Sequence, residues 1–166
     1  RWSDGAHTVE EMAAAAAARG YDGIAVTDHS GSLVVARGLN AARLREQRAA
    51  LAAGAYACTV ASGMEVDILA DGRLDMDDAL LAELDWVVGS VHSAMLQSEA
   101  VMTERLLRAI SSGRLDALGH PTGRVLGGRP GYEFDVDAVL DACAAYNVAL
   151  EINAAPERLD LNDELL

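Results

Sequence analysis

Five short runs of consecutive apolar residues alternate with amphipathic or alanine-rich segments along the chain, and this pattern restricts the fold more than any other feature. The runs are Gly23–Thr27, Thr59–Met64, Trp86–Val91, Leu115–Leu118 and Val148–Ile152. Strands that are apolar on both faces belong to parallel sheets covered by helices. Strand–helix alternation of this kind predicts an α/β barrel or a doubly wound sheet. No glycine-rich phosphate loop follows any run, which favours the barrel.

The intervening segments carry helix signals. Thr8 and Glu11 have the spacing of a capping box, and the alanine-rich stretch that follows ends at Arg19, with Gly20 as the stop signal. Further helices are predicted over 41–53, 75–84, 99–112 and 136–146.

Composition excludes several classes of protein. The 166 residues fit one domain with a real core, and 51% of them are hydrophobic, which rules out a disordered tail. The net charge of −13 and the 4% aromatic content argue against a free-standing nucleic-acid-binding module. No apolar run approaches the roughly 20 residues that cross a membrane, and no signal peptide is evident, so a cytoplasmic protein is expected. Cys58 and Cys143 lie in apolar stretches and are interpreted as buried thiols rather than a disulfide.

Three of the four histidines follow predicted strands directly. His29, His92 and His120 occupy such positions, and Glu65 takes the equivalent place after Met64. The carboxyl ends of the strands of a parallel barrel meet at one rim, where active sites are built. A single histidine at such a place is more often structural, but three with a glutamate favour metal ligation.

Histidine nitrogen and carboxylate oxygen together suit zinc, manganese or iron(II). A glutamate among histidines can bridge two ions, and two ions about 3.5–4 Å apart hold a phosphate and activate water. Bound cations would also supply the positive charge that this acidic chain otherwise lacks at a phosphate site.

Other polar residues allow two interpretations each. Asp28 either supports a ligating imidazole or caps the next turn. Arg124 either grips a phosphate in bidentate fashion or is a solvated loop residue. Asp4 on its own merits is a turn residue. A further group of carboxylates lacks calcium-loop spacing and is interpreted as a solvated turn followed by an acidic helix start: Asp67, Asp71, Asp75, Asp77 and Asp78.

Taken in order, the motifs resemble the PHP superfamily, named for polymerase and histidinol phosphatase. They are Ser3-Asp4-Gly5, Thr27-Asp28-His29-Ser30, Gly63–Leu69, Ser90-Val91-His92 and Gly119-His120-Pro121. Three further segments resemble the branch attached to bacterial and archaeal family X DNA polymerases: 71–75, 119–124 and 150–161. The resemblance spans essentially the whole chain.

The resemblance implies a distorted (β/α)7 barrel with parallel strands and a trinuclear zinc or manganese site. Its ligands would be Asp4, His29, Glu65, His92 and His120, with Glu65 bridging. Glu65 and Arg124 are the residues expected to serve catalysis. The implied activity is 3′–5′ exonuclease or related processing of DNA ends in repair, with DNA 3′ ends reached through the full-length polymerase.

Two family motifs, an opening His-x-His and a closing Asp-x-His, have no counterpart in residues 1–166. The chain is therefore expected to be a partial PHP domain that is catalytically incomplete alone. Two other functions stay open at this point: a small-molecule phosphatase of the histidinol-phosphatase type, and a catalytically degenerate accessory domain.

Overall fold

The computed structural model describes residues 2–163 and 165, which form two compact units. The first unit comprises residues 1–66 and 76–87, and the second comprises 67–75 and 88–166. The strand order is β1-β2-β3-β4-β5 in one five-stranded sheet. The registered pairs β1–β2, β3–β4 and β4–β5 are all parallel. The α/β class and the parallel strands predicted from the sequence are confirmed, as expected for part of a (β/α) barrel.

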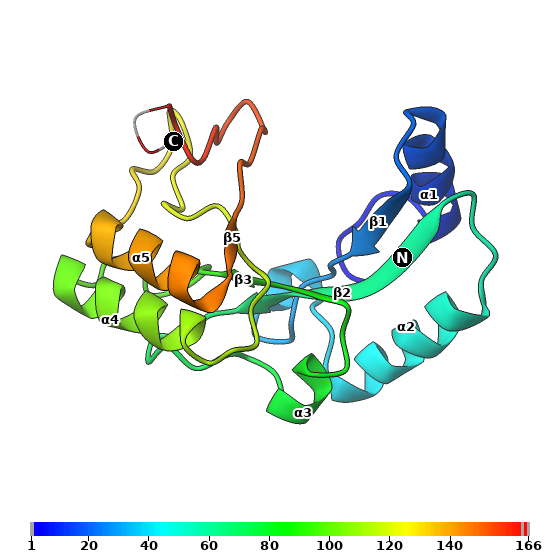
Figure 1. Cartoon of the computed structure of the whole chain (residues 1–166), viewed down its shortest axis with the longest axis horizontal. Coiled ribbons are helices and arrows are strands. Elements are labelled where there is room, and N and C mark those ends of the chain that lie inside the picture. The colour runs from blue at the N-terminus through cyan, green and yellow to red at the C-terminus, as the bar shows by residue number, and fades with distance from the viewer. Residues whose placement is uncertain (1, 164, 166) are drawn as a thin grey trace. The chain divides into compact units, whose positions relative to one another are not determined.

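The first unit begins with α1 (Val9–Ala18), and its predicted capping box is present. Thr8 Oγ1 accepts from Glu11 N at 3.2 Å, and Glu11 Oε2 accepts from Thr8 N at 2.8 Å. The helix packs on β1 (Gly23–Val26), beside which it lies in Figure 1. Its contact face consists of the small residues Ala13 and Ala16, both buried, which allow a close approach.

The rest of the first unit holds the long strand β2. After a 3-10 turn, η1 (Val34–Ala36), comes α2 (Ala41–Ala53), which Asn40 caps by accepting from Arg43 N at 3.0 Å. β2 (Thr59–Asp67) pairs with β1 from Gly23↔Thr59 to Val26↔Ser62. A Cβ at Gly63 would lie 2.5 Å from Trp86 O, so this position requires glycine. Leu39, Leu44, Met64 and Val66 are fully buried and form the core.

The helix predicted over 75–84 is much shorter in the structure. It is α3 (Asp78–Leu81), because Asp77 acts as the N-cap, accepting from Ala79 N at 2.9 Å, and Ala82 ends the helix. β3 (Trp86–Ser90) follows. The prediction for Asp77 and Asp78, an acidic helix start, is confirmed.

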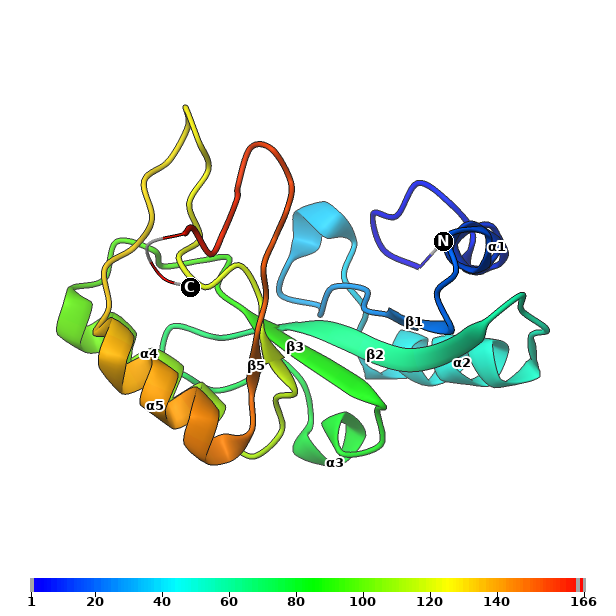
Figure 2. The ribbon, with the colours of Figure 1, turned by 45° about the horizontal axis from the view of Figure 1, so that its top comes forward.

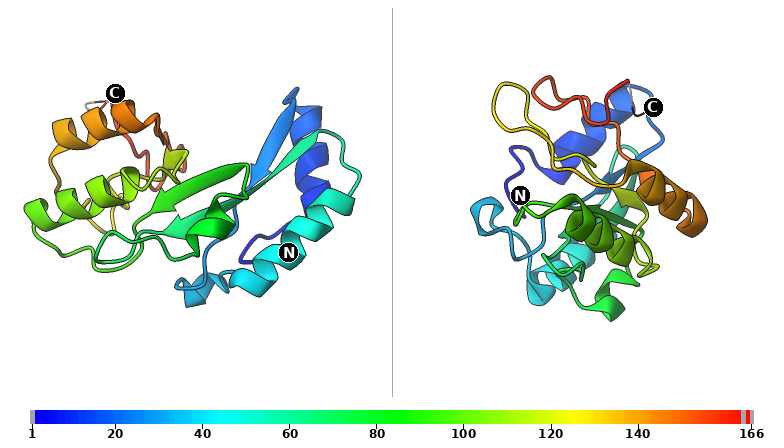
Figure 3. Two further views of the ribbon diagram at one scale, coloured as in Figure 1. Left: turned by 60° about the horizontal axis from the view of Figure 1, so that its bottom comes forward. Right: turned by 90° about the vertical axis from the view of Figure 1, so that its left-hand side faces the viewer.

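The second unit contains α4 (Glu99–Ile110), β4 (Ala117–Leu118), α5 (Val136–Tyr146) and β5 (Ala149–Leu150). The two helices lie side by side in both Figure 2 and Figure 3 and contact each other along their length. The buried residues include Met102, Leu106, Ile110 and Leu118. Cys143 is a buried free thiol as predicted, whereas Cys58 is a free thiol that is only half-buried. No helix in the described part of the chain has the length and apolarity that a membrane span needs.

Candidate functional site

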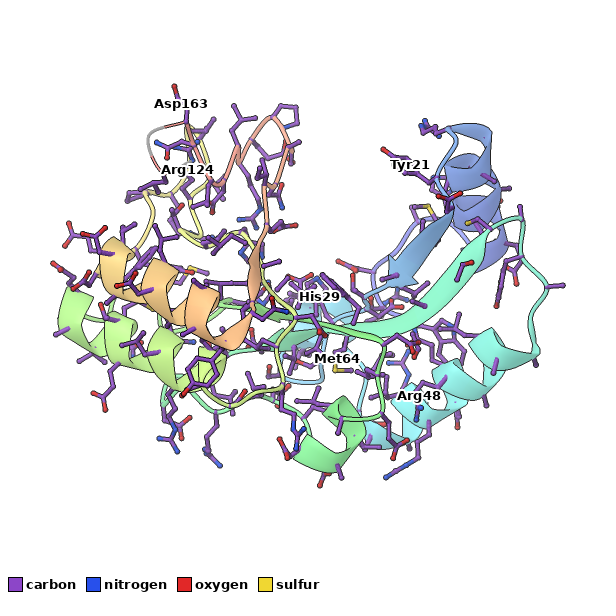
Figure 4. All side chains as sticks on the ribbon, in the orientation of Figure 1. Tyr21, His29, Arg48, Met64, Arg124 and Asp163 are labelled. Carbon is purple, nitrogen blue, oxygen red and sulfur yellow. The ribbon has the colours of Figure 1, made fainter. Side chains whose placement is uncertain are left out.

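The carboxyl end of β1 brings His29 next to Glu65. The parallel ladder continues beyond β1, with Glu65 N donating to Asp28 O at 3.1 Å and Ser30 N donating to Glu65 O at 3.0 Å. Nδ1 of His29 therefore lies 3.6 Å from Oε2 of Glu65, and both side chains are about four-fifths buried. A nitrogen and a carboxylate oxygen at this separation can bind a common cation. His29 is labelled in Figure 4.

Both residues line a pocket of the first unit. The pocket has a volume of about 400 Å³, and Asp4 and Asp28 also line it. Apolar side chains of α1 and β1, among them Met12 and Ile24, form the rest of its wall. Three of the five predicted ligands, Asp4, His29 and Glu65, thus share one pocket.

Asp28 clamps the segment that carries Asp4, a role that neither sequence interpretation included. Its Oδ1 accepts from Ser3 N at 2.8 Å and from the Ser3 hydroxyl, and its Oδ2 accepts from Gln47 Nε2 at 2.5 Å. Ser3 and Gln47 are buried. The carboxylate therefore ties residue 3 and helix α2 to the end of β1.

Two arginines complete this clamp by donating to backbone carbonyls. Arg37 donates to Ser3 O at 2.8 Å, and Arg43 donates to Trp2 O. Residues 2 and 3 are held on both sides of their backbone, and the clamp fixes the position from which Asp4 enters the pocket. No local sequence signal marks these arginines, because their partners lie 34 and 41 residues away.

In the second unit, His92 is bonded to a carboxylate. Nδ1 of His92 and Oδ1 of Asp67 are 2.7 Å apart, and only 4% of the Asp67 side chain is exposed. The interpretation of Asp67 as part of a solvated turn is therefore wrong, since its partner lies 25 residues along the chain. Asp71, by contrast, is exposed and pairs with Arg73, which holds the pKa of the Asp71 carboxyl below its usual value. The exposed turn begins at Ala70, after the buried Ile68.

His120 lies beside His92. Their ring centroids are 5.1 Å apart, and the ring planes are inclined by 69°. His120 has a φ of +28°, an unusual value for a residue with a side chain. Glu151, directly after β5, accepts from His120 N at 2.5 Å and stabilises this conformation. Glu151 was not among the predicted site residues, because the sequence pattern places it inside the predicted strand Val148–Ile152, whereas β5 ends at Leu150.

Arg105 of α4 is a buried cation beneath the same loops, and it too escaped prediction. It is 2% exposed and donates to Ile68 O, to Ser93 O at 3.0 Å and to Gln97 Oε1 at 3.0 Å. Burial lowers the pKa of its guanidinium, while the negative charge of Asp67 acts in the opposite direction. Arg105 thus connects the residue after Asp67 with the residue after His92.

Part of the Arg124 guanidinium is occupied by hydrogen bonds to backbone carbonyls. Its Nε donates to Arg158 O at 2.9 Å, and its Nη2 donates to Leu159 O. Figure 4 labels Arg124 among the loops of the second unit. Its predicted grip on a substrate phosphate stays a prediction, with Nη1 as the donor that these two bonds leave over.

Comparison with known proteins identifies relatives over nearly the whole chain. The family model described as PHP domain matches residues 1–155. The chain is 47% identical over 168 residues to the DNA polymerase/3′-5′ exonuclease PolX of Bacillus subtilis, covering 99% of this chain and 30% of that protein. It is 36% identical over 149 residues to a probable phosphatase of Photobacterium profundum, covering 88% and 57% respectively. The chain therefore spans about a third to somewhat over half of these relatives.

Proposed function

Because this chain belongs to the PHP domain family, we propose that it acts as a metal-dependent phosphoesterase. The observation that carries the proposal is the pairing of His29 with Glu65 inside a pocket that Asp4 also lines. A nitrogen donor and carboxylate donors around one pocket suit manganese or zinc. Such ions, when bound, stabilise the charge of a phosphate ester under attack and activate water.

The proposed ligands are distributed over both units. They are Asp4, His29 and Glu65 in the first unit, and His92 and His120 in the second. Glu65 is assigned the bridging role, since a carboxylate has two oxygens for two ions. Asp67 holds the ring of His92 through Nδ1, and Nε2 is assigned as the metal donor. Arg124 is assigned the binding of a substrate phosphate oxygen through its remaining donors.

The more specific proposal concerns the substrate: the phosphoesterase would remove nucleotides from DNA 3′ ends. It is supported by the 47% identity to a protein named a 3′-5′ exonuclease, against 36% to a probable phosphatase. Hydrolysis of a small phosphomonoester is the second candidate, supported by the phosphatase relatives and by a pocket of about 400 Å³. A catalytically degenerate accessory domain is the third alternative, and it would bind metal without hydrolysing either substrate.

The test compares Glu65→Gln with Glu46→Gln, a matched change at an exposed glutamate of α2. Manganese binding is measured by titration calorimetry in the chain, and hydrolysis is measured in the protein as its gene encodes it. Glu65→Gln is expected to weaken metal binding at least tenfold and to abolish most of the hydrolysis, because the bridging oxygen pair is lost. Arg124→Ala is expected mainly to raise KM. Unchanged metal binding and activity in Glu65→Gln would remove the basis of the proposal.

The substrate decides between the first two candidates. A labelled DNA 3′ end and a small phosphomonoester are offered to the same preparation with manganese. Hydrolysis of the small ester without release of nucleotides favours the phosphatase. Hydrolysis of neither substrate by a preparation that binds manganese favours the accessory domain.

A further inference from the structure

Two loops of the second unit are joined into one structure, which we call the paired loops: residues 122–131 and 152–160. Leu126 N donates to Glu157 O at 2.7 Å, and Gly123 N donates to Asp160 Oδ2 at 2.9 Å. Asp160 is completely buried, so this junction is firm. In Figure 2 the two loops, yellow and red, extend from the second unit.

The tip of the first loop is a tight turn. Val125 N donates to Arg129 O at 2.8 Å, and Arg129 N donates to Val125 O at 2.9 Å. Gly127 lies at the turn with a φ of +73°, a conformation that favours glycine. The loop is therefore ordered by its own hydrogen bonds, and a ligand would not have to order it.

Three arginines of the paired loops are oriented by backbone carbonyls. Arg129 donates through Nε and Nη2 to Gly123 O at 3.2 and 2.8 Å, and Arg158 donates through Nη1 to Arg124 O at 3.4 Å. Within residues 2–163 and 165, none of these arginines forms an ion pair with a carboxylate. Their positive charges are thus fixed in place and uncompensated by contact.

Two leucines lie beside the arginines and face solvent. Leu126 and Leu159 are 48% and 47% exposed, and the φ of Leu159 is +46°, an unfavourable conformation for leucine. The Leu159 side chain is therefore exposed to solvent although its backbone conformation is energetically unfavourable. This surface thus presents exposed apolar groups next to oriented guanidinium groups. A ligand that carries flat apolar groups alternating with anionic groups could contact both.

A single strand of DNA is such a ligand. Its phosphates pair with guanidinium groups in planar geometry, and its unpaired bases present apolar faces. The whole chain carries a charge of −13, which repels a polyanion at long range. The paired loops together contain three arginines and two carboxylates, and one of these carboxylates, Asp160, is completely buried and accepts from Gly123 N.

We propose that the paired loops bind single-stranded DNA, with Arg129 and Arg158 on backbone phosphates and Leu126 and Leu159 against bases. This inference rests on the proposed function only for the choice of nucleic acid as ligand. It adds a surface for the strand apart from the His29–Glu65 pocket of the first unit.

The test is fluorescence anisotropy with a labelled single-stranded oligodeoxynucleotide of about 12 nucleotides, a typical site size. EDTA is present, so binding is measured without hydrolysis. The double variant Arg129→Ala/Arg158→Ala is compared with Arg19→Ala/Arg45→Ala, which removes the same charge from exposed positions of the first unit. Thermal melting verifies folding, and Arg129→Lys/Arg158→Lys keeps the charge should the alanine variant unfold.

The loop variant is expected to bind about tenfold more weakly than the control variant. Its plot of log affinity against log salt should lose about 1.4 in slope, since each phosphate contact on a single strand contributes about 0.7. The lysine variant should keep most of that slope. Equal losses in the loop and control variants would show that only net charge matters, and would overturn the proposal.

No binding by the unsubstituted chain would overturn it as well. Neither result depends on the phosphoesterase proposal, which is tested by metal binding and hydrolysis.

Discussion

Nδ1 of His92 lies 2.7 Å from Oδ1 of Asp67, and both side chains are largely withdrawn from solvent. A carboxylate accepts at this distance, so Nδ1 of His92 is the nitrogen that donates, and in the neutral imidazole of this tautomer Nε2 is the acceptor nitrogen. Asp67 thus fixes the orientation of the ring, and the metal-ligand role proposed for His92 would use Nε2.

Replacement of Asp67 by asparagine should weaken metal binding without unfolding the protein. Loss of a carboxylate behind a ligating histidine typically lowers metal affinity about 10–100-fold. Titration calorimetry with manganese and with zinc measures the effect, and Asp71→Asn, an exposed carboxylate in the same unit, is the control. Equal affinities in the two variants would mean that His92 needs no help from Asp67.

Removal of the Asp28 carboxylate should cost stability. In Asp28→Ala, the buried Gln47 amide and Ser3 N lose their acceptor, and each orphaned group costs about 1–3 kcal/mol. Urea unfolding provides the measurement. Asp22→Ala, at the amino end of the same strand, is the control and should change little. A midpoint that stays at the wild-type value would show that the clamp adds nothing to folding.

Asp85 should make stability sensitive to acid. Its carboxylate accepts from the Ser62 hydroxyl and from Ser62 N, both at 2.8 Å, and these hydrogen bonds lower the pKa of Asp85. A depressed folded-state pKa means stability that is present above the unfolded-state pKa of about 3.9 and is lost as pH falls through the folded-state pKa.

Melting temperatures of the wild type and Asp85→Asn, measured from pH 7 to pH 2.5, test this expectation. The wild type should be the more stable protein at neutral pH by about 1 kcal/mol or less, because the carboxylate is exposed and screened. The two curves should converge toward pH 3. Parallel curves would refute the role of the charge.

The strands were predictable from their continuous apolar runs, such as Trp86–Val91, which parallel strands covered by helices share. Burial is complete only in β4, whereas β1 stays partly exposed. The cap of α1 was predictable because Thr8 and Glu11 are only three residues apart. The start of α3 was not predictable, since Asp77 caps a helix that the sequence pattern places from Asp75 onward. Local sequence signals thus predict which helices and strands form, whereas the choice between neighbouring capping residues sets where a helix begins.

The residues of the candidate site likewise fall into those that local sequence reveals and those that depend on distant partners. His29 and Glu65 follow predicted strands, and that position revealed them, although β2 in the structure extends through Glu65 to Asp67. Asp67 appeared to be one of several acidic turn residues, because its burial depends on an imidazole 25 positions away. Asp28, likewise, owes its role to Ser3 and Gln47, which lie 25 and 19 residues distant. Partners so remote leave no trace in local sequence.

Strand β2 places Glu65 and Asp67 two residues apart, and alternation along a strand sends their side chains to the same face. Glu65 meets His29 in the first unit, whereas Asp67 meets His92 in the second. A single residue inserted or deleted between them would turn one carboxylate to the opposite face. The spacing between Glu65 and Asp67 must therefore stay at two residues if each carboxylate is to keep its histidine partner.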